Sequence, residues 1–158
     1  MNALDFPQKD HAAKPLLMLV DDQPRNARLL QAQLGHEHFN FLVAQSGEEA
    51  LALLREQLPD LIILDFMMPG MNGQQVATVI KQDERTRTIP VIMLTALSDQ
   101  ASRMQALSAG VEEFVNKPVD QSELWTRVRN LLRLKSFQDE LADHNRRLAG
   151  LVAERTRQ

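Results

Sequence analysis

The stretch Leu61-Ile62-Ile63-Leu64-Asp65, followed by Phe66-Met67-Met68-Pro69-Gly70-Met71-Asn72-Gly73, decides the fold of this chain. A continuous apolar run is typical of a strand covered on both faces, as in a parallel sheet. This run ends on a carboxylate, and the segment after it is rich in turn-forming residues. We therefore expect a buried strand over 61–65 that carries the Asp65 side chain at its carboxyl end.

Three other apolar runs end in the same way on polar residues. Residues 16–20 lead into Asp21-Asp22, residues 91–94 into Thr95, and residues 114–116 into Lys117-Pro118. The carboxyl ends of parallel strands lie along one edge of an open sheet, where ligands bind at the reversal of strand order. These side chains are therefore expected to share one pocket with Asp65. Carboxylates, a hydroxyl and an ammonium together suit a divalent cation and a phosphoryl group.

Segments of helical periodicity alternate with the strands. Five strands alternating with five helices predict a doubly wound α/β domain with helices on both faces of the sheet. Ser46 and Glu49 match a capping box at the start of the second helix. We expect strands at 16–20, 39–44, 61–65, 91–95 and 113–116, and helices from Pro24 to Gly35, Gly47 to Leu58, Gly73 to Asp83, Ser98 or Asp99 to Gly110, and Gln121 to Arg155.

Composition excludes several classes of protein. The 158 residues include no cysteine, so disulfides, thiolate catalysis and cysteine-based zinc sites are excluded. The net charge of −3 gives no reason to expect contact with nucleic acid or an anionic membrane. No apolar run approaches the roughly 20 residues that span a bilayer. We expect a cytoplasmic protein with a mobile leader at 1–14 and one domain at 15–133.

The last predicted helix is longer than the domain that precedes it. Some 35 residues span roughly 50 Å, whereas a domain of this size is on the order of 35–40 Å across. Residues 134–158 should therefore project, and their leucine spacing predicts a parallel two-stranded coiled coil and a homodimer. The alternative is an amphipathic helix that packs against a missing partner or frays. The expected seam consists of Leu131, Leu134, Gln138, Leu141, Asn145, Leu148 and Val152.

These motifs together resemble the receiver domain of two-component response regulators. The resemblance rests on Asp21-Asp22, residues 65–73, Thr95-Ala96 and Lys117-Pro118, in this order, and it covers about residues 15–133. It implies a flavodoxin-like sheet of strand order 2-1-3-4-5. It also implies a sensor histidine kinase or phosphotransfer protein as the partner.

The resemblance assigns a role to each residue of the pocket. Asp65 would accept a phosphoryl group from phosphohistidine, with Thr95 and Lys117 contacting that group. Mg²⁺, for which Mn²⁺ could substitute, would be bound by Asp22, Asp65 and the backbone carbonyl of Met67, and through water by Asp21. A cis Lys117–Pro118 bond would direct the lysine into the pocket. Thr95 and Phe114 would form the conformational switch. Met67 and Leu97 would flank the path of a hydrolytic water.

The function beyond the pocket stays open at this point. The charged tail at 152–157 resembles linkers that precede HD-GYP phosphodiesterase domains, and also those before diguanylate cyclase or histidine kinase modules. We therefore expect an output domain that the chain lacks, with a cyclic-di-GMP phosphodiesterase as the leading candidate. The alternative is a stand-alone receiver or interaction module. No stand-alone turnover enzyme is expected, because a haloacid-dehalogenase-type phosphotransferase needs an aspartate where Met67 stands.

Overall fold

The computed structural model describes residues 14–96, 103–104 and 107–156, with side chains as far as Leu151. Its strands form one parallel sheet in the order β2-β1-β3-β4-β5, which confirms the predicted fold class and strand order. The strands are β1 (Leu16–Val20), β2 (Asn40–Ala44), β3 (Leu61–Asp65), β4 (Val91–Ala96) and β5 (Glu113–Lys117). The helices are α1 (Pro24–Leu34), α2 (Gly47–Glu56), α3 (Gly73–Gln82) and α5 (Gln121–Thr156).

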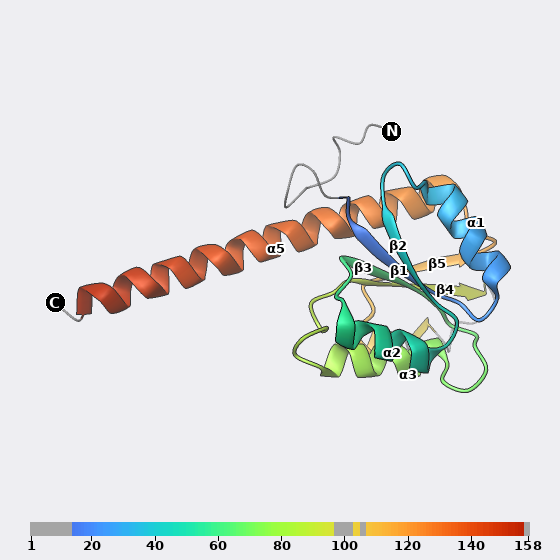
Figure 1. Cartoon of the computed structure of the whole chain (residues 1–158), viewed down its shortest axis with the longest axis horizontal. Helices are drawn as coiled ribbons and strands as arrows, with labels where there is room; N and C mark the ends of the chain where they lie inside the picture. Colours follow the sequence, from blue (N-terminus) through green and yellow to red (C-terminus); the bar gives the residue numbers. More distant parts are fainter. Residues whose placement is uncertain (1–13, 97–102, 105–106, 157–158) are drawn as a thin grey trace.

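The sheet lies between two layers of helices (Figure 1). Along β1, Leu17 and Leu19 pack in one core cluster with residues of α1 and α5. Met18 and Val20 point to the other face and pack with residues of α2 and α3. Because side chains of a strand alternate between faces, a strand buried on both faces must be apolar throughout. This is why the strands appear in the sequence as unbroken apolar runs.

The boundaries of α2 correct the sequence-based prediction. The helix ends at Glu56 rather than Leu58, and Gln57 is already extended. Pro59 disfavours helical conformation at the residue before it, so the chain leaves the helix early. The capping box is only half formed. Ser46 Oγ accepts the Glu49 N–H, but the Glu49 carboxylate accepts from the Gln45 N–H instead.

A complete capping box occurs at α3, where the sequence analysis did not identify one. Asn72 Oδ1 accepts the Gln75 N–H at 2.9 Å, and Gln75 Oε1 accepts the Asn72 N–H at 2.9 Å. Asn and Gln make the same reciprocal bonds as the Ser and Glu of the more familiar motif. The other differences are single residues: α3 ends one residue early at Gln82, β2 begins at Asn40, and β4 and β5 extend to Ala96 and Lys117. The helix start expected at Ser98 or Asp99 lies outside the described residues.

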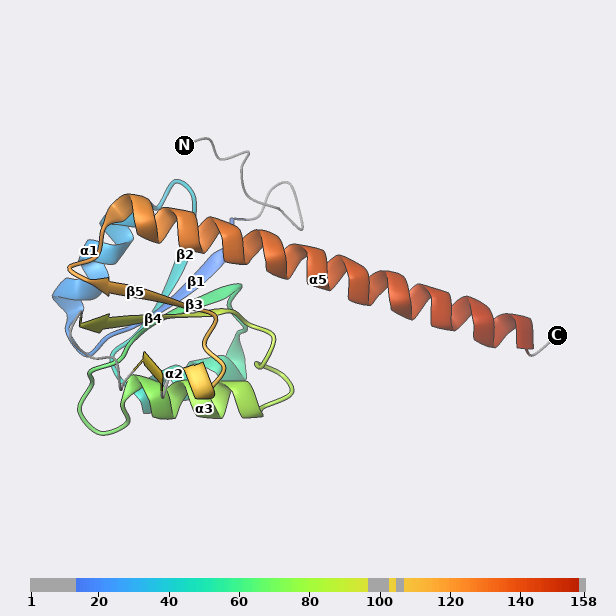
Figure 2. The ribbon, with the colours of Figure 1, turned by 180° about the vertical axis from the view of Figure 1, so that it is seen from behind.

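The final helix has two parts with different surroundings. Asp120 Oδ1 accepts the Glu123 N–H and caps its start. Leu124 and Val128 are fully buried against the sheet, whereas Leu134 is 52% exposed. From there on the helix projects beyond the domain, as Figures 1 and 2 both show. The prediction that Leu131 begins a dimer seam is wrong, because Leu131 is buried in the domain's own core.

Candidate functional site

The carboxyl edge of the sheet brings three predicted carboxylates together. Asp21 and Asp22 follow β1, and Asp65 ends the neighbouring strand β3. One oxygen of each carboxylate lies within 4.8 Å of the others. Asp21 is 1% exposed and Asp65 is 3% exposed, so these acids are nearly removed from solvent. Their mutual repulsion is therefore poorly screened, and the cluster favours a bound cation.

Lys117 brings a positive charge to this cluster from the end of β5. Its Nζ donates a hydrogen bond to Asp65 Oδ1 at 2.7 Å. The Lys117–Pro118 peptide bond is cis, as the resemblance implied. Three carboxylates and one ammonium leave the pocket with a formal charge of −2 when all are ionised. The lysine alone therefore does not neutralise the pocket.

Two buried polar atoms of the pocket have no hydrogen-bond partner among the described residues. They are Asp21 Oδ2 and the Thr95 hydroxyl oxygen. Burial raises the pKa of Asp21, and the charge of Asp65 adds to that effect, while the Gln23 N–H and Lys117 oppose it. Unsatisfied buried oxygens on clustered carboxylates suit a hard, oxygen-seeking divalent cation such as Mg²⁺. The residues present therefore fit the metal that the sequence predicts.

The loop after Asp65 is held closely against the acceptor strand. The Gly73 N–H donates to the Phe66 carbonyl at 2.9 Å. A Cβ on Gly73 would lie 2.6 Å from the Asp65 carbonyl oxygen, so only glycine fits at this position. The Met67 N–H reaches Asp65 Oδ1 at 3.3 Å, and the Met67 side chain is 66% exposed. The loop thus fixes the acceptor backbone while it leaves one thioether side chain beside the pocket.

The two predicted switch residues lie on adjacent strands. Thr95 ends the buried part of β4, and Phe114 pairs in register with Met93 of the same strand. The Phe114 ring is partly buried against the core cluster on the α2 and α3 side of the sheet. The Arg103 guanidinium contacts the Asn116 side chain, next to Lys117. The sequence analysis missed this contact, because neither residue belongs to a recognisable motif.

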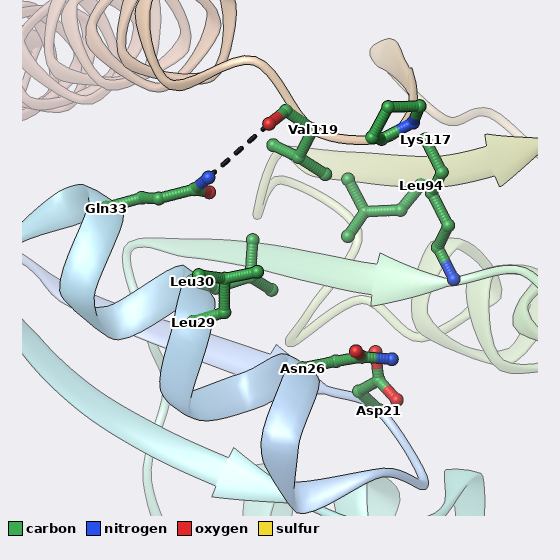
Figure 3. A pocket seen from close by; sticks show the side chains of 9 residues that line it. Asp21, Asn26, Leu29, Leu30, Gln33, Leu94, Lys117 and Val119 are labelled. Atoms are coloured by element: carbon green, nitrogen blue, oxygen red, sulfur yellow. Dashed lines mark hydrogen bonds between the residues drawn. The ribbon is translucent and has the colours of Figure 1, made fainter.

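A cavity of about 260 Å³ opens beside the acidic cluster (Figure 3). Asp21 and Lys117 lie at its end nearest the cluster, and Leu94 forms part of its wall. The Gln33 side chain donates across the cavity to the Val119 carbonyl at 3.4 Å. The sequence did not predict this cavity, since its lining residues come from α1 and from residues at or near the ends of β1, β4 and β5, which lie far apart in the chain. The remaining lining residues are Asn26, Leu29, Leu30 and Pro118.

Comparison with known proteins identifies the family. Residues 17–129 match the family model for the response regulator receiver domain. The chain is a response regulator receiver domain. It is 45% identical over 125 residues to the response regulator PleD of Caulobacter vibrioides, an alignment that covers 79% of this chain and 28% of PleD. It is also 35% identical over 147 residues to hybrid signal transduction histidine kinase D of Dictyostelium discoideum, covering 90% of this chain and 9% of that protein.

Solved structures agree with this assignment. The signal receiver domain of a histidine kinase from Syntrophus aciditrophicus superimposes with a TM-score of 0.71 at 34% identity, covering 75% of this chain and 90% of that one. The receiver domain of a Francisella response regulator superimposes with a TM-score of 0.68 at 28% identity, covering 76% of this chain and 98% of that one. This receiver domain therefore spans less than a third of the curated relatives named above.

Membership of the family sets the general role of the pocket. Receiver domains bind Mg²⁺ in an acidic pocket, which in this chain is the cluster of Asp21, Asp22 and Asp65. They interact with histidine kinases or phosphotransfer proteins. No helix within the described part of the chain is both long enough and apolar enough to cross a membrane.

Proposed function

We propose that this receiver domain accepts a phosphoryl group on Asp65 from the phosphohistidine of a sensor histidine kinase or phosphotransfer protein. The observation that carries the proposal is the 2.7 Å contact between Lys117 and the buried Asp65 within a cluster of carboxylates at a sheet edge. In the reaction an Asp65 oxygen bonds to phosphorus in line with the breaking phosphorus–nitrogen bond.

The other pocket residues position this reaction and neutralise charge. Lys117 and the Thr95 hydroxyl donate to the phosphoryl oxygens, which gives the unsatisfied threonine its partner. Asp22, Asp65 and the Met67 carbonyl would hold Mg²⁺ directly, and Asp21 would hold it through water. When bound, the cation supplies positive charge next to the transferred group, and Mn²⁺ can replace it because it also prefers oxygen ligands.

The cavity beside α1 provides a surface on which the phosphodonor protein docks. A donor histidine has to approach Asp65, so its protein must cover the surface around the pocket. The cavity presents Leu29, which is 57% exposed, and Val119 on opposite sides. Apolar walls that lead to a charged pocket suit an apolar side chain of the donor placed next to its phosphohistidine.

Phosphorylation would be communicated through Thr95 and Phe114. A phosphoryl group on Asp65 attracts the Thr95 hydroxyl, and its movement makes room for the partly buried Phe114 ring. Phe114 has no hydroxyl, so packing alone favours the inward position. The second arrangement is populated to the extent that the phosphoryl group favours it over the first.

The projecting part of α5 provides the output through a second copy of this chain. Its exposed apolar residues repeat at intervals of three, four and seven, as in the seam between two identical helices. At 100° per residue they lie roughly 160° around the helix from the residues buried in the domain. The stripe therefore faces away from the receiver domain. It consists of Leu134, Phe137, Leu141, Leu148 and Leu151, between 47% and 68% exposed.

The seam begins at Leu134, since Leu131 is buried. Gln138, Asn145 and Val152 complete the parallel pairing predicted from the heptads. Phe137 and Leu151 flank this seam and widen the apolar face. An output domain after this helix, with a cyclic-di-GMP phosphodiesterase as the specific candidate, rests on the resemblance of the charged tail. A stand-alone receiver module is the second candidate, and the gene sequence downstream of Gln158 discriminates between them.

The phosphoacceptor proposal is tested with acetyl phosphate and MgCl₂, followed by intact mass spectrometry. The wild-type chain should gain the mass of one phosphoryl group, and Asp65→Asn should gain none. Asp143→Asn, on the exposed part of α5, is the matched control and should behave as the wild type. A phosphoryl group retained by Asp65→Asn would overturn the proposal.

The dimer proposal is tested by light scattering of the wild type and Leu141→Asp. The charge introduced into the apolar stripe should produce a monomer. Leu58→Asp is the control, because Leu58 is 47% exposed but lies outside α5. An unchanged oligomeric state after Leu141→Asp, or after deletion of residues 135–158, would remove the helix from the mechanism.

A further inference from the structure

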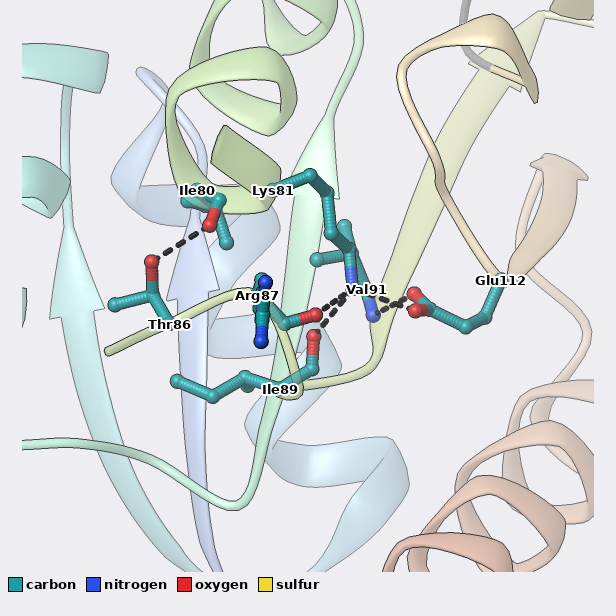
Figure 4. A network of polar contacts seen from close by, with 7 residues as sticks. All are labelled: Ile80, Lys81, Thr86, Arg87, Ile89, Val91 and Glu112. Atoms are coloured by element: carbon teal, nitrogen blue, oxygen red, sulfur yellow. Dashed lines mark hydrogen bonds and ion pairs between the residues drawn. The ribbon is translucent and has the colours of Figure 1, made fainter. Parts of the chain in front are cut away.

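A saturated polar network lies at the amino edge of the sheet, opposite the phosphorylation pocket (Figure 4). Lys81 Nζ, near the end of α3, donates to three oxygens. These are the Ile89 carbonyl at 2.7 Å, the Arg87 carbonyl at 3.1 Å and Glu112 Oε1 at 2.5 Å. An ammonium group has three donors, so every one of them is used. The Lys81 side chain is only 11% exposed.

Glu112 connects this lysine to the first residue of β4. Its Oε2 accepts the Val91 N–H at 2.7 Å, and its own N–H donates to the Val91 carbonyl at 3.2 Å. The glutamate therefore extends the pairing of β4 and β5 by one residue at their amino ends. Gly110, two residues before it, has a φ of +94°, and a Cβ at this position would lie 3.4 Å from the Lys81 Cγ. Glycine adopts this backbone conformation without strain.

The network connects three elements that each run between it and the pocket side of the sheet. Helix α3 runs from the acceptor loop after Asp65 to Lys81. Strands β4 and β5 run from the network to Thr95 and Lys117 at the other edge. A displacement at the pocket could therefore reach the amino edge along α3 or along either strand. Lys81 and Glu112 join all three routes at one point.

We propose that the Lys81–Glu112 pair is a positioning device that fixes the amino ends of β4 and β5 to α3 and so confines the phosphorylation-dependent change to the carboxyl edge and the β5–α5 face. Strands fixed at one end cannot shift along their axes. The response to a new charge on Asp65 is then a rearrangement of side chains near Thr95 and Phe114. Without the pair, part of the change would spread into the turn between α3 and β4.

The pair is suited to this role because both partners are fully bonded. Loss of the Lys81 charge leaves the part-buried Ile89 carbonyl without its donor. Loss of the Glu112 charge leaves the Lys81 ammonium, on a side chain only 11% exposed, without its anionic partner, so an intermediate position is unfavourable. Packed elements with complete bonding respond by discrete rearrangement rather than by gradual deformation. The inference rests on the proposed phosphorylation of Asp65, and the experiment separates the two.

The test is hydrogen–deuterium exchange of each protein with and without acetyl phosphate, in MgCl₂, after intact mass has established phosphorylation. In the wild type, exchange should change several-fold in peptides over 61–73 and 91–96, and by less than twofold over 84–90. In Lys81→Met and Glu112→Gln, the change should extend several-fold into 84–90. Each protein is compared with itself with and without acetyl phosphate. A general increase in exchange caused by the substitution alone therefore cancels in the comparison. Glu112→Gln is the milder variant, since its amide oxygen still accepts the Val91 N–H.

Lys135→Met is the matched control. Lys135 is 13% exposed and pairs with Asp139 at 2.9 Å, but it lies on α5 away from this network. It should show the wild-type pattern. A wild-type response over 84–90 equal to that at 91–96, or a wild-type pattern in both variants, overturns the proposal. If the wild type gains no phosphoryl mass, the proposed function fails, and the same comparison with and without Mg²⁺ tests confinement independently.

Discussion

The two edges of the sheet contain similar residue types in opposite states of satisfaction. At the carboxyl edge, Asp21 Oδ2 and the Thr95 hydroxyl have no partner among the described residues, and three carboxylates crowd together. At the amino edge, every donor of Lys81 and both carboxylate oxygens of Glu112 are bonded. The carboxyl edge is therefore suited to bind a cation and a phosphoryl group, whereas the amino edge only joins parts of the chain to one another.

The carboxyl edge therefore serves function, and the amino edge serves the stability of the domain. Unsatisfied polar groups in a protein interior cost free energy, so natural sequences retain them where a ligand completes them. The acidic cluster should therefore lower stability and support phosphorylation, whereas the Lys81 network should raise stability and leave phosphorylation unaffected. Substitutions at the two edges should affect different measurements.

Lys117→Met should have the largest effect, on the rate of phosphorylation. Removal of a positive charge that contacts the transferred group should slow phosphorylation by acetyl phosphate by about 100-fold. The rate is measured by intact mass at fixed MgCl₂ concentration. Lys135→Met, which removes a lysine of lower exposure far from the pocket, should keep the wild-type rate. Equal loss in both variants would contradict a local role for Lys117.

Lys81→Met should mainly lower stability. It leaves two carbonyls and one Glu112 oxygen without their donor, of which only the Ile89 carbonyl bond is part-buried, so the loss should cost about 1–2 kcal/mol of unfolding free energy. Urea unfolding measures this cost, and the extent of phosphorylation should stay unchanged. A large loss of phosphorylation with unchanged stability would invert the contrast between the two edges.

Asp21→Asn should stabilise the metal-free protein. The pKa of Asp21 is raised by burial in the folded state, so the folded protein binds this proton more tightly than the unfolded chain. The contribution of Asp21 is therefore unfavourable above its folded pKa, and the penalty disappears as pH falls through that pKa. Without metal, the free energy of unfolding of the variant should exceed that of the wild type by about 1 kcal/mol at neutral pH. The difference should be smaller in acid.

Added MgCl₂ should reverse this order. The wild type should gain stability from the metal, whereas Asp21→Asn should gain less because it has lost a carboxylate. Thermal unfolding at several pH values, with and without MgCl₂, provides both comparisons. An Asp21→Asn protein less stable than the wild type without metal would show that the cluster is not strained by repulsion.

Met67→Asn should have the smallest effect, a several-fold shorter lifetime of the phosphoryl group. Met67 is 66% exposed, and its backbone N–H donates to Asp65 Oδ1, so we expect its side chain to hinder an attacking water that an asparagine side chain would instead hydrogen-bond. Loss of the phosphoryl mass over time measures the lifetime. If the wild type lost the phosphoryl group faster than Met67→Asn, the prediction would be wrong. Leu97, the other residue predicted to flank the water path, lies outside the described residues.

The sequence predicted the sheet and the pocket because both depend on local pattern. Unbroken apolar runs identify strands buried on both faces, and in a parallel sheet the residues after them must meet at one edge. Asp21, Asp65 and Lys117 could therefore be placed together from their positions alone. The amino edge has no such rule, since Lys81 lies near the end of α3 and Glu112 just before β5, and the two meet only through their side chains.

The seam on α5 shows a second limit of sequence reading. A heptad pattern assigns Leu131 and Leu134 to the same face, because it treats the helix as isolated. Only the structure shows that the domain covers Leu131 and ends before Leu134. The cavity beside α1 escaped prediction for the same reason, since tertiary packing and not periodicity creates it.

The length of α5 means that a small change in its angle would move its far end by a large distance. The helix has 36 residues, and roughly 35 Å of it extends past the buried part. A tilt of about 5° at its root would move the far end by roughly 3 Å, more than half of the 5.4 Å pitch of a helix. In the buried part of α5, Trp125 Nε1 and Gln121 Nε2 both donate to the Gln33 carbonyl of α1. A change beside α1 that tilted this part of the helix would therefore be magnified along the projecting part.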